Sequence, residues 1–176
     1  MTSIDSGSVV EPLDERVDHV RGETGAPVIL EYGDYECPSR QAFRSIERVE
    51  RELSGHVRFA FRHFPLTQIH PHALAASAAA GAAARQDRFW EMHSLLFRRQ
   101  NALEDDDLRS HADETGLDLL GFDRDRADAD VLARIARDVA SAEASGVVRG
   151  TPTLFIDGVL HQGGYDTEAL LEVLRR

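Results

Sequence analysis

The 176-residue chain has a single cysteine, Cys37, so it cannot form an intramolecular disulfide. It has no lysine, because all 20 of its basic residues are arginine. That absence excludes Schiff-base lysine chemistry and the phosphate-binding P-loop, since both need a lysine. The chain also lacks a run of about 18 apolar residues, so no segment is predicted to span a membrane. The formal net charge is −11, which disfavours nucleic acid and anionic membrane surfaces as partners.

The N-terminal residues 1–16 mix Ser, Gly, Asp, Glu and Pro without periodicity, a composition that predicts a flexible lead-in. No basic residue precedes an apolar stretch there, so the segment does not have the pattern of a secretory signal. We therefore expect a cytoplasmic protein, in a compartment where thiols stay reduced. A lone cysteine in that setting is free for chemistry other than a structural disulfide.

The first half of the remaining chain predicts a strand, a helix and a second strand. Residues 28–32 form a short apolar run bounded by turn residues, which is typical of a buried strand. Apolar residues then recur at helical spacing from Pro38 to a terminal Gly55. Apolar and polar residues alternate over 57–62, so a second strand follows. A helix between two strands predicts a right-handed parallel crossover.

The second half predicts a hairpin and a final helix after a long helical segment. Residues 153–156 form an apolar strand, and Asp157-Gly158 is a strong two-residue hairpin signal. Residues 166–176 carry an apolar face behind a capping residue. Residues 68–149 are too many for a structureless loop and carry helical patterns, so we expect an inserted helical subdomain. The fold class is α/β.

Cys37 lies where the first strand gives way to the helix, directly before Pro38. A thiol in the first turn of a helix lies among unpaired backbone N–H groups at the positive end of the helix dipole, which favours the nucleophilic thiolate. Three residues later, where a redox pair would have its second cysteine, the sequence has Arg40. Any exchange chemistry at this site must therefore use one thiol.

Several separate blocks occur in an order that resembles the DsbA-like branch of the thioredoxin superfamily. The blocks are Gly33-Asp34-Tyr35-Glu36-Cys37-Pro38, Arg62-His63-Phe64-Pro65-Leu66, His70-Pro71, Phe89-Trp90-Glu91-Met92-His93 and Gly150-Thr151-Pro152-Thr153. The resemblance implies a thioredoxin-like domain made of residues 17–67 and 150–176, with the helical insertion at 68–149.

The resemblance also implies roles for individual residues. Cys37 corresponds to the thiol that attacks a disulfide, while Thr151 and Pro152 form the facing loop, whose X-Pro bond is a candidate for the cis form. Pro38 and Ser39 complete the substrate-binding set. Because Arg40 replaces the resolving cysteine, we expect Arg40 to stabilise the thiolate, and a low-mass thiol such as glutathione or a bacterial equivalent to release the adduct as co-substrate. The expected partners are protein or small-molecule disulfides and thiols.

Two other functions remain open from the sequence. One is a thioredoxin-fold module that has lost redox turnover and binds peptides or acts as a chaperone through the Thr151-Pro152 loop. The other is a glutathione-dependent transferase or isomerase, in which Ser39 and Arg40 activate bound glutathione. No metal is expected: His70-Pro71-His72 matches no common zinc motif, and residues 104–107 are better explained as a helix cap. The oligomeric state is left open.

Overall fold

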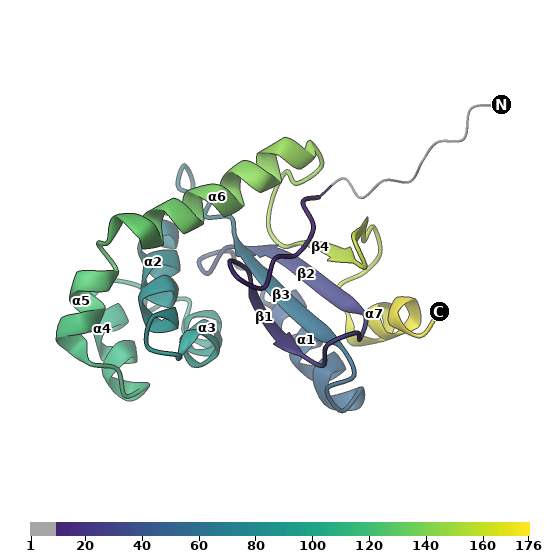
Figure 1. Ribbon diagram of the computed structural model, residues 1–176, viewed down its shortest axis with the longest axis horizontal. Coiled ribbons are helices and arrows are strands. Elements are labelled where there is room, and N and C mark those ends of the chain that lie inside the picture. Colours follow the sequence, from purple (N-terminus) through teal and green to yellow (C-terminus); the bar gives the residue numbers. More distant parts are fainter. Residues whose placement is uncertain (1–9) are drawn as a thin grey trace.

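The computed structural model describes residues 10–176 and contains one mixed sheet with helices on both faces (Figure 1). The sheet has five strands in the order β1-β3-β2-β4-β5. The strands are β1 (His19–Gly22), β2 (Val28–Gly33), β3 (Arg58–His63), β4 (Thr153–Ile156) and β5 (Val159–Leu160). Strands β2 and β3 are parallel, and every other pair is antiparallel. The expected α/β thioredoxin-like fold is confirmed.

Helix α1 (Gln41–Glu52) makes the crossover between β2 and β3, and α7 (Thr167–Leu174) packs beside it on the same face of the sheet. Strands β4 and β5 form the expected hairpin. Its two turn residues, Asp157 and Gly158, have φ angles of 48° and 80°, as a two-residue type I′ turn requires. Strand β1 was not predicted, because four residues at a sheet edge are too few to show an alternating pattern.

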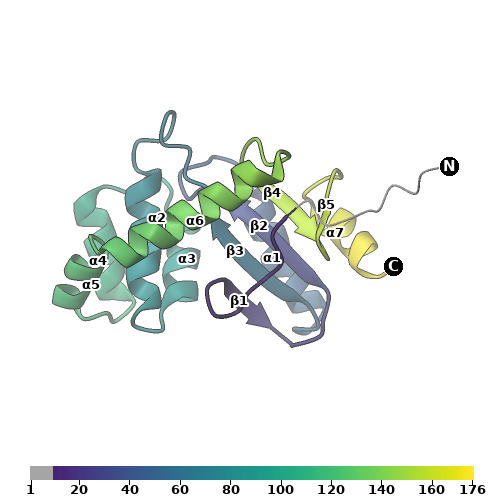
Figure 2. The ribbon, with the colours of Figure 1, turned by 45° about the horizontal axis from the view of Figure 1, so that its top comes forward.

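Five helices lie between β3 and β4, within the segment 68–149. They are α2 (Ala73–Ala84), α3 (Phe89–Arg98), α4 (Asp105–Glu114), α5 (Leu119–Asp125) and α6 (Ala129–Ser145). Helices α2 to α5 form a lobe beside the sheet, and α6 runs from that lobe back across the sheet toward β4 (Figure 2). No helix of residues 10–176 is both long enough and apolar enough to cross a bilayer.

The two faces of the sheet bury different cores. On one face, Ile29, Phe59 and Phe61 pack with apolar residues of α1, α3 and α7. On the other face, Leu30 and Tyr32 pack in a smaller cluster with residues from the end of α6 and from the N-terminal segment. The alternation of side chains along β2 and β3 therefore separates an extensive apolar layer from a mixed one.

The N-terminal segment differs from its expectation. Residues 1–9 of the expected flexible stretch 1–16 lie outside the described residues. Val10 is only 5% exposed and packs in the smaller cluster. The carbonyls of Glu11 and Pro12 accept hydrogen bonds from the guanidinium of Arg62 at 3.0 and 3.1 Å. The packed domain therefore begins before residue 17, because a buried arginine on β3 needs those backbone acceptors.

Candidate active site around Cys37

Cys37 lies in a turn between β2 and α1, and the helix starts later than expected. The Cys37 N–H donates to the Asp34 carbonyl at 3.1 Å, which closes a turn before any helical hydrogen bond forms. The first helical residue is Gln41, and Arg40 is the N-cap. The expectation that Cys37 lies in the first helical turn is therefore wrong, because Cys37 precedes the helix and lies in the loop before it.

The thiol of Cys37 meets the loop that was expected to face it. Cys37 is 9% exposed, and its Sγ donates to the Thr151 carbonyl oxygen at 3.2 Å. The two residues are 114 positions apart in the chain. The Thr151–Pro152 peptide bond is cis. The fold thus brings the Cys37 thiol and the proline loop into direct contact.

The proline loop has its own supports. The Tyr165 hydroxyl donates to the Pro152 carbonyl at 3.0 Å, and the Thr153 hydroxyl donates to the Gly150 carbonyl at 2.7 Å. The Thr151 hydroxyl is buried and finds no hydrogen-bond partner within residues 10–176. Thr151 therefore presents an engaged carbonyl and an unsatisfied hydroxyl at the same loop.

Two histidines after β3 hold the Cys37 loop. The buried Asp34 carboxylate accepts from His70 Nδ1 at 2.7 Å, from the Leu66 N–H and from the Glu36 N–H, both at 2.8 Å. Glu36 accepts from the backbone N–H and the Nδ1 of His72 at 2.7 and 2.9 Å. Its hydrogen bond to Glu36 raises the pKa of His72. The His-Pro-His motif therefore positions the loop, a role that the sequence did not reveal.

The acidic residues 104–107, which were considered for cation binding, have a structural role. Residues 10–176 contain no group of three or more His, Cys, Asp or Glu side chains that could hold a metal ion. Glu104 and Asp107 form the expected cap of α4, with reciprocal side-chain and backbone hydrogen bonds.

Gln100, which follows α3, also fixes the Cys37 loop. Its side-chain amide donates to the carbonyls of Tyr35 and Cys37 at 2.8 and 2.6 Å. Tyr35 is itself fully buried and hydrogen-bonds His93 Nδ1 through its hydroxyl at 3.0 Å. A single glutamine outside any motif carries no sequence signal, so sequence reasoning had no means of finding this contact.

A buried carboxyl lies on β2 below this loop. Glu31 is 2% exposed, and its Oε2 has no hydrogen-bond partner among the described residues. Burial raises the pKa of Glu31 to about 8, against a smaller opposing effect of Arg21. Glu31 shares its face of β2 with Ile29, and burial together with the Glu31 charge raises the pKa of Tyr165. Glu31 is thus an acid kept largely neutral at pH 7.

The side chains of Arg40 and Ser39 form no hydrogen bond with the Cys37 thiol, which donates to Thr151 instead. Within residues 10–176 neither side chain forms a hydrogen bond or ion pair. Pro38 and Ser39 are exposed, and Arg40 is half-buried. Pro38 and Arg40 line one end of a groove of about 560 Å³ that continues between α1 and the start of α7. Of the expected site residues, the fold therefore joins Cys37 to the Thr151-Pro152 loop and turns Arg40 toward a neighbouring groove.

Comparison with known proteins agrees with this geometry. A family model described as thioredoxin matches residues 14–176. A thioredoxin-like oxidoreductase from Silicibacter pomeroyi superimposes with a TM-score of 0.79 at 26% identity, covering 90% of this chain and 91% of that one. The fold is also shared with BdbD from Bacillus subtilis, at a TM-score of 0.80, 19% identity and 96% coverage of both chains. The thiol-disulfide exchange protein α-DsbA2 from Wolbachia pipientis has a TM-score of 0.80 at 19% identity, over 92% of this chain and 87% of that one.

The curated relatives carry a different name. A protein named Na⁺/H⁺ antiporter NhaA 1 from Salinispora arenicola is 45% identical over 161 residues, which are 90% of this chain and 24% of that protein. One of the same name from Mycolicibacterium vanbaalenii is 39% identical over 170 residues, 94% of this chain and 27% of that protein. This chain therefore spans about a quarter of the length of these relatives. The match to the thioredoxin family model over residues 14–176 shows that the chain belongs to the thioredoxin family, and the sheet order agrees with this assignment.

Proposed function

We propose that the chain is a thiol-disulfide oxidoreductase that works by a monothiol mechanism, with Cys37 forming mixed disulfides with protein or low-mass thiols. The observation that carries this proposal is the 3.2 Å contact between the Cys37 Sγ and the Thr151 carbonyl, in a chain with no second cysteine. The fold that the chain shares with a thioredoxin-like oxidoreductase supports exchange at this loop, and the missing second thiol means that the adduct must be released by an external thiol.

The reaction consists of two exchanges. Cys37 loses its proton to solvent, and its thiolate attacks one sulfur of a disulfide R–S–S–R. A bond forms between Cys37 and that sulfur, and the other sulfur leaves as RS⁻ with the bonding electron pair. A low-mass thiolate then attacks the sulfur of R in the mixed disulfide and expels the Cys37 thiolate. The protein is regenerated, and one disulfide has been exchanged for another without net oxidation or reduction.

The surrounding residues have distinct roles in this scheme. The thiol must leave the Thr151 carbonyl before it attacks, so substrate entry and activation are coupled at the proline loop. Thr151 and Pro152 then face the bound partner, and Pro38 and Ser39, which are exposed, form part of the surface that receives it. The guanidinium of Arg40, which has no hydrogen-bond or ion-pair partner among the described residues, stabilises the thiolate by its charge and attracts acidic substrates.

The proposed setting is the cytoplasm, because resolution needs a large reduced thiol pool. Glutathione or a bacterial equivalent would act as co-substrate, without being held as a resident cofactor. The match covers only 24% of the Salinispora arenicola protein that is named an antiporter, so ion transport is no part of this proposal.

The test is adduct formation followed by mass spectrometry. Reduced protein is mixed with excess oxidised glutathione, and the mixed disulfide is timed over a range of pH and then challenged with fresh reduced glutathione. We expect one adduct per chain, formed faster as pH rises, and released by the added thiol. Cys37→Ser should form none, and Arg40→Ala should slow formation several-fold at pH 7.

The matched control for Arg40→Ala is Arg51→Ala, which removes an exposed arginine from the far end of α1. A wild-type protein that forms no adduct while retaining its fold would contradict the proposal and point instead to a peptide-binding module. An adduct that forms but resists fresh thiol would contradict the monothiol cycle.

A further inference from the structure

We infer that Arg40, Arg44 and Arg48 form a cationic groove that binds the carboxylates of a low-mass disulfide, so that Cys37 reacts preferentially with acidic, amino-acid-like disulfides. This inference rests on the proposed function and names its substrate class. The three residues are spaced four apart and lie along one side of the start of α1. At 1.5 Å per residue they span about 12 Å, the size of a tripeptide-like ligand.

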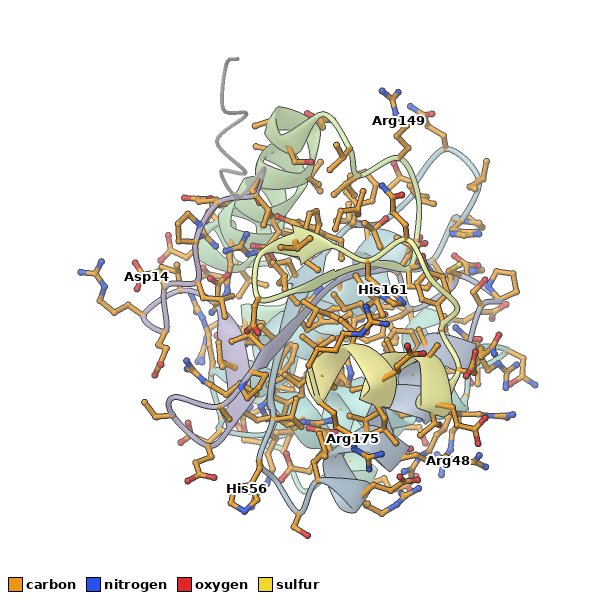
Figure 3. The ribbon with its side chains drawn as sticks, turned by 90° about the vertical axis from the view of Figure 1, so that its right-hand side faces the viewer. Asp14, Arg48, His56, Arg149, His161 and Arg175 are labelled. Atoms are coloured by element: carbon orange, nitrogen blue, oxygen red, sulfur yellow. The ribbon has the colours of Figure 1, made fainter. Side chains whose placement is uncertain are left out.

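The groove begins at Pro38, the residue after Cys37. Its lining includes Pro38, which directly follows Cys37, and the three arginines, with a volume of about 560 Å³. The opposite wall is the start of α7, which lies beside α1; Figure 3 shows Arg48 next to α7. A molecule joined to the Cys37 sulfur can therefore extend along this groove.

The three arginines have no protein partners. Among the described residues none of their side chains forms an ion pair or hydrogen bond, whereas most other arginines of the chain are paired with Asp or Glu. Like charges four residues apart on a helix repel each other. A bound carboxylate relieves that repulsion and gains charge-assisted hydrogen bonds from planar guanidinium groups. In a chain with a net charge of −11, three adjacent unpaired cations form a local exception.

The opposite wall refines the ligand class. It carries Asp166 and Glu168, and Asp166 is engaged as the N-cap of α7, where its carboxylate accepts from the Ala169 N–H at 3.0 Å. The groove therefore has three cations facing two acids and keeps a net positive charge. This pattern suits a ligand with more carboxylates than amines, whose ammonium group faces the acidic wall. It disfavours neutral and purely cationic disulfides.

The test compares three disulfide probes of different charge. The rate of Cys37 adduct formation is measured with oxidised glutathione, with neutral hydroxyethyl disulfide and with cationic cystamine, for the wild type and for Arg44→Gln/Arg48→Gln. We expect the ratio of the oxidised-glutathione rate to the hydroxyethyl disulfide rate to fall about tenfold in the variant at low salt. The ratio of the cystamine rate to the hydroxyethyl disulfide rate should rise. The difference should shrink in 0.5 M salt, because the Debye length drops below about 5 Å. Arg51→Gln, which removes the same charge outside the groove, should leave the ratios within about twofold.

A second measurement separates the groove from the chemistry. S-methylglutathione cannot exchange disulfides, so its binding, followed by NMR shifts along α1, tests the groove even if the thiol is inert. We expect shifts at Arg44 and Arg48 in the wild type and several-fold weaker binding in the double variant. If the wild type reacts with all three probes and the double variant shows the same rate ratios, this inference is overturned and the proposed function is not. Failure of all three probes would instead overturn the proposed function, and the absence of S-methylglutathione binding would overturn the groove.

Discussion

The charged side chains on the two flanks of Cys37 differ in whether they have partners within the fold. On the N-terminal flank, Asp34 and Glu36 are each bonded to a histidine and to backbone N–H groups. On the C-terminal flank, Arg40, Arg44 and Arg48 have no charged partner among the described residues. Charges that are satisfied within the fold hold the loop in place, whereas unsatisfied charges at the surface remain available to a ligand. Below the loop, Glu31 differs from Asp34 and Glu36, because it is buried and its Oε2 has no hydrogen-bond partner among the described residues.

The largest expected effect on the free energy of unfolding is at Glu31, the buried acid whose Oε2 has no hydrogen-bond partner among the described residues. Because the pKa of Glu31 is raised from 4.5 to about 8, ionising it costs stability, and that loss accumulates as pH rises from 4.5 to about 8 and then levels off. Glu31→Gln removes this titration. The variant should gain a few kcal/mol relative to wild type across that window, since each pKa unit is worth about 1.4 kcal/mol. Urea unfolding at pH 5 and pH 8.5 measures it, and a difference that is constant with pH would contradict the raised pKa.

The second-largest effect on stability is expected at Asp34, the buried acid with three hydrogen-bond donors. Asp34→Ala removes the acceptor of three hydrogen bonds in a site that is 1% exposed. We expect a loss of about 3 kcal/mol, because buried donors are left unpaired. Asp34→Asn keeps one carbonyl oxygen and should lose less. Urea unfolding at pH 7 measures both variants, and a loss below about 1 kcal/mol for Asp34→Ala would show that the loop does not depend on this carboxylate.

A smaller effect is expected at Gln100. Gln100→Ala frees the carbonyls of Tyr35 and Cys37, with a loss of about 1 to 2 kcal/mol. The Cys37 loop should also loosen, so amide hydrogen exchange should rise for residues 35–37 more than for α7. Gln86→Ala, which removes another side-chain amide bridging two segments, is the control. Unchanged exchange in the loop would contradict a positioning role for Gln100.

The fourth effect is small and depends on pH. The pKa of His72 is raised by its hydrogen bond to Glu36, so the pair stabilises the fold fully below the ordinary histidine pKa of about 6.5. That contribution is lost as pH rises through the raised pKa. The stability difference between wild type and His72→Gln should therefore be larger at pH 5.5 than at pH 8.5, as measured by urea unfolding. The opposite slope would show that the two side chains do not pair in solution.

The smallest effect is expected on the unpaired flank. Arg44→Gln/Arg48→Gln breaks no hydrogen bond or ion pair of the described structure, so its stability should stay within about 0.5 kcal/mol of wild type. A slight gain is consistent with relief of repulsion between the arginines. Thermal unfolding checks this, and a loss above about 1 kcal/mol would mean that these side chains support the fold and would weaken the contrast between the two flanks.

The order of strands and helices could largely be predicted because its signals are local. A short apolar run bounded by turn residues identified β2, and alternation identified β3. Helical spacing identified α1 and the helical character of the insertion. Local signals also misled: Pro38 is compatible with a first helical turn, but the Asp34 turn delays the helix to Gln41. The four-residue β1 left no readable pattern, and Val10 joined the core although its neighbourhood is polar.

The candidate site divides in the same way. The lone Cys37, the absent second thiol and the loop containing Pro152 are fixed by residue identity, and the sequence by itself determined that any exchange must use one thiol. The resemblance predicted that the Thr151-Pro152 loop faces Cys37, but only the tertiary structure decided that the Thr151 carbonyl accepts from the thiol and that His70 and His72 bond to acids. It also decided that Arg40, Arg44 and Arg48 have no ion-pair partner among the described residues. The reason is physical: periodicity indicates which face of an element is buried, but nothing in the sequence distinguishes a carboxylate that will have a partner from one that will not. Which charge is satisfied depends on partners that folding brings together from distant parts of the chain.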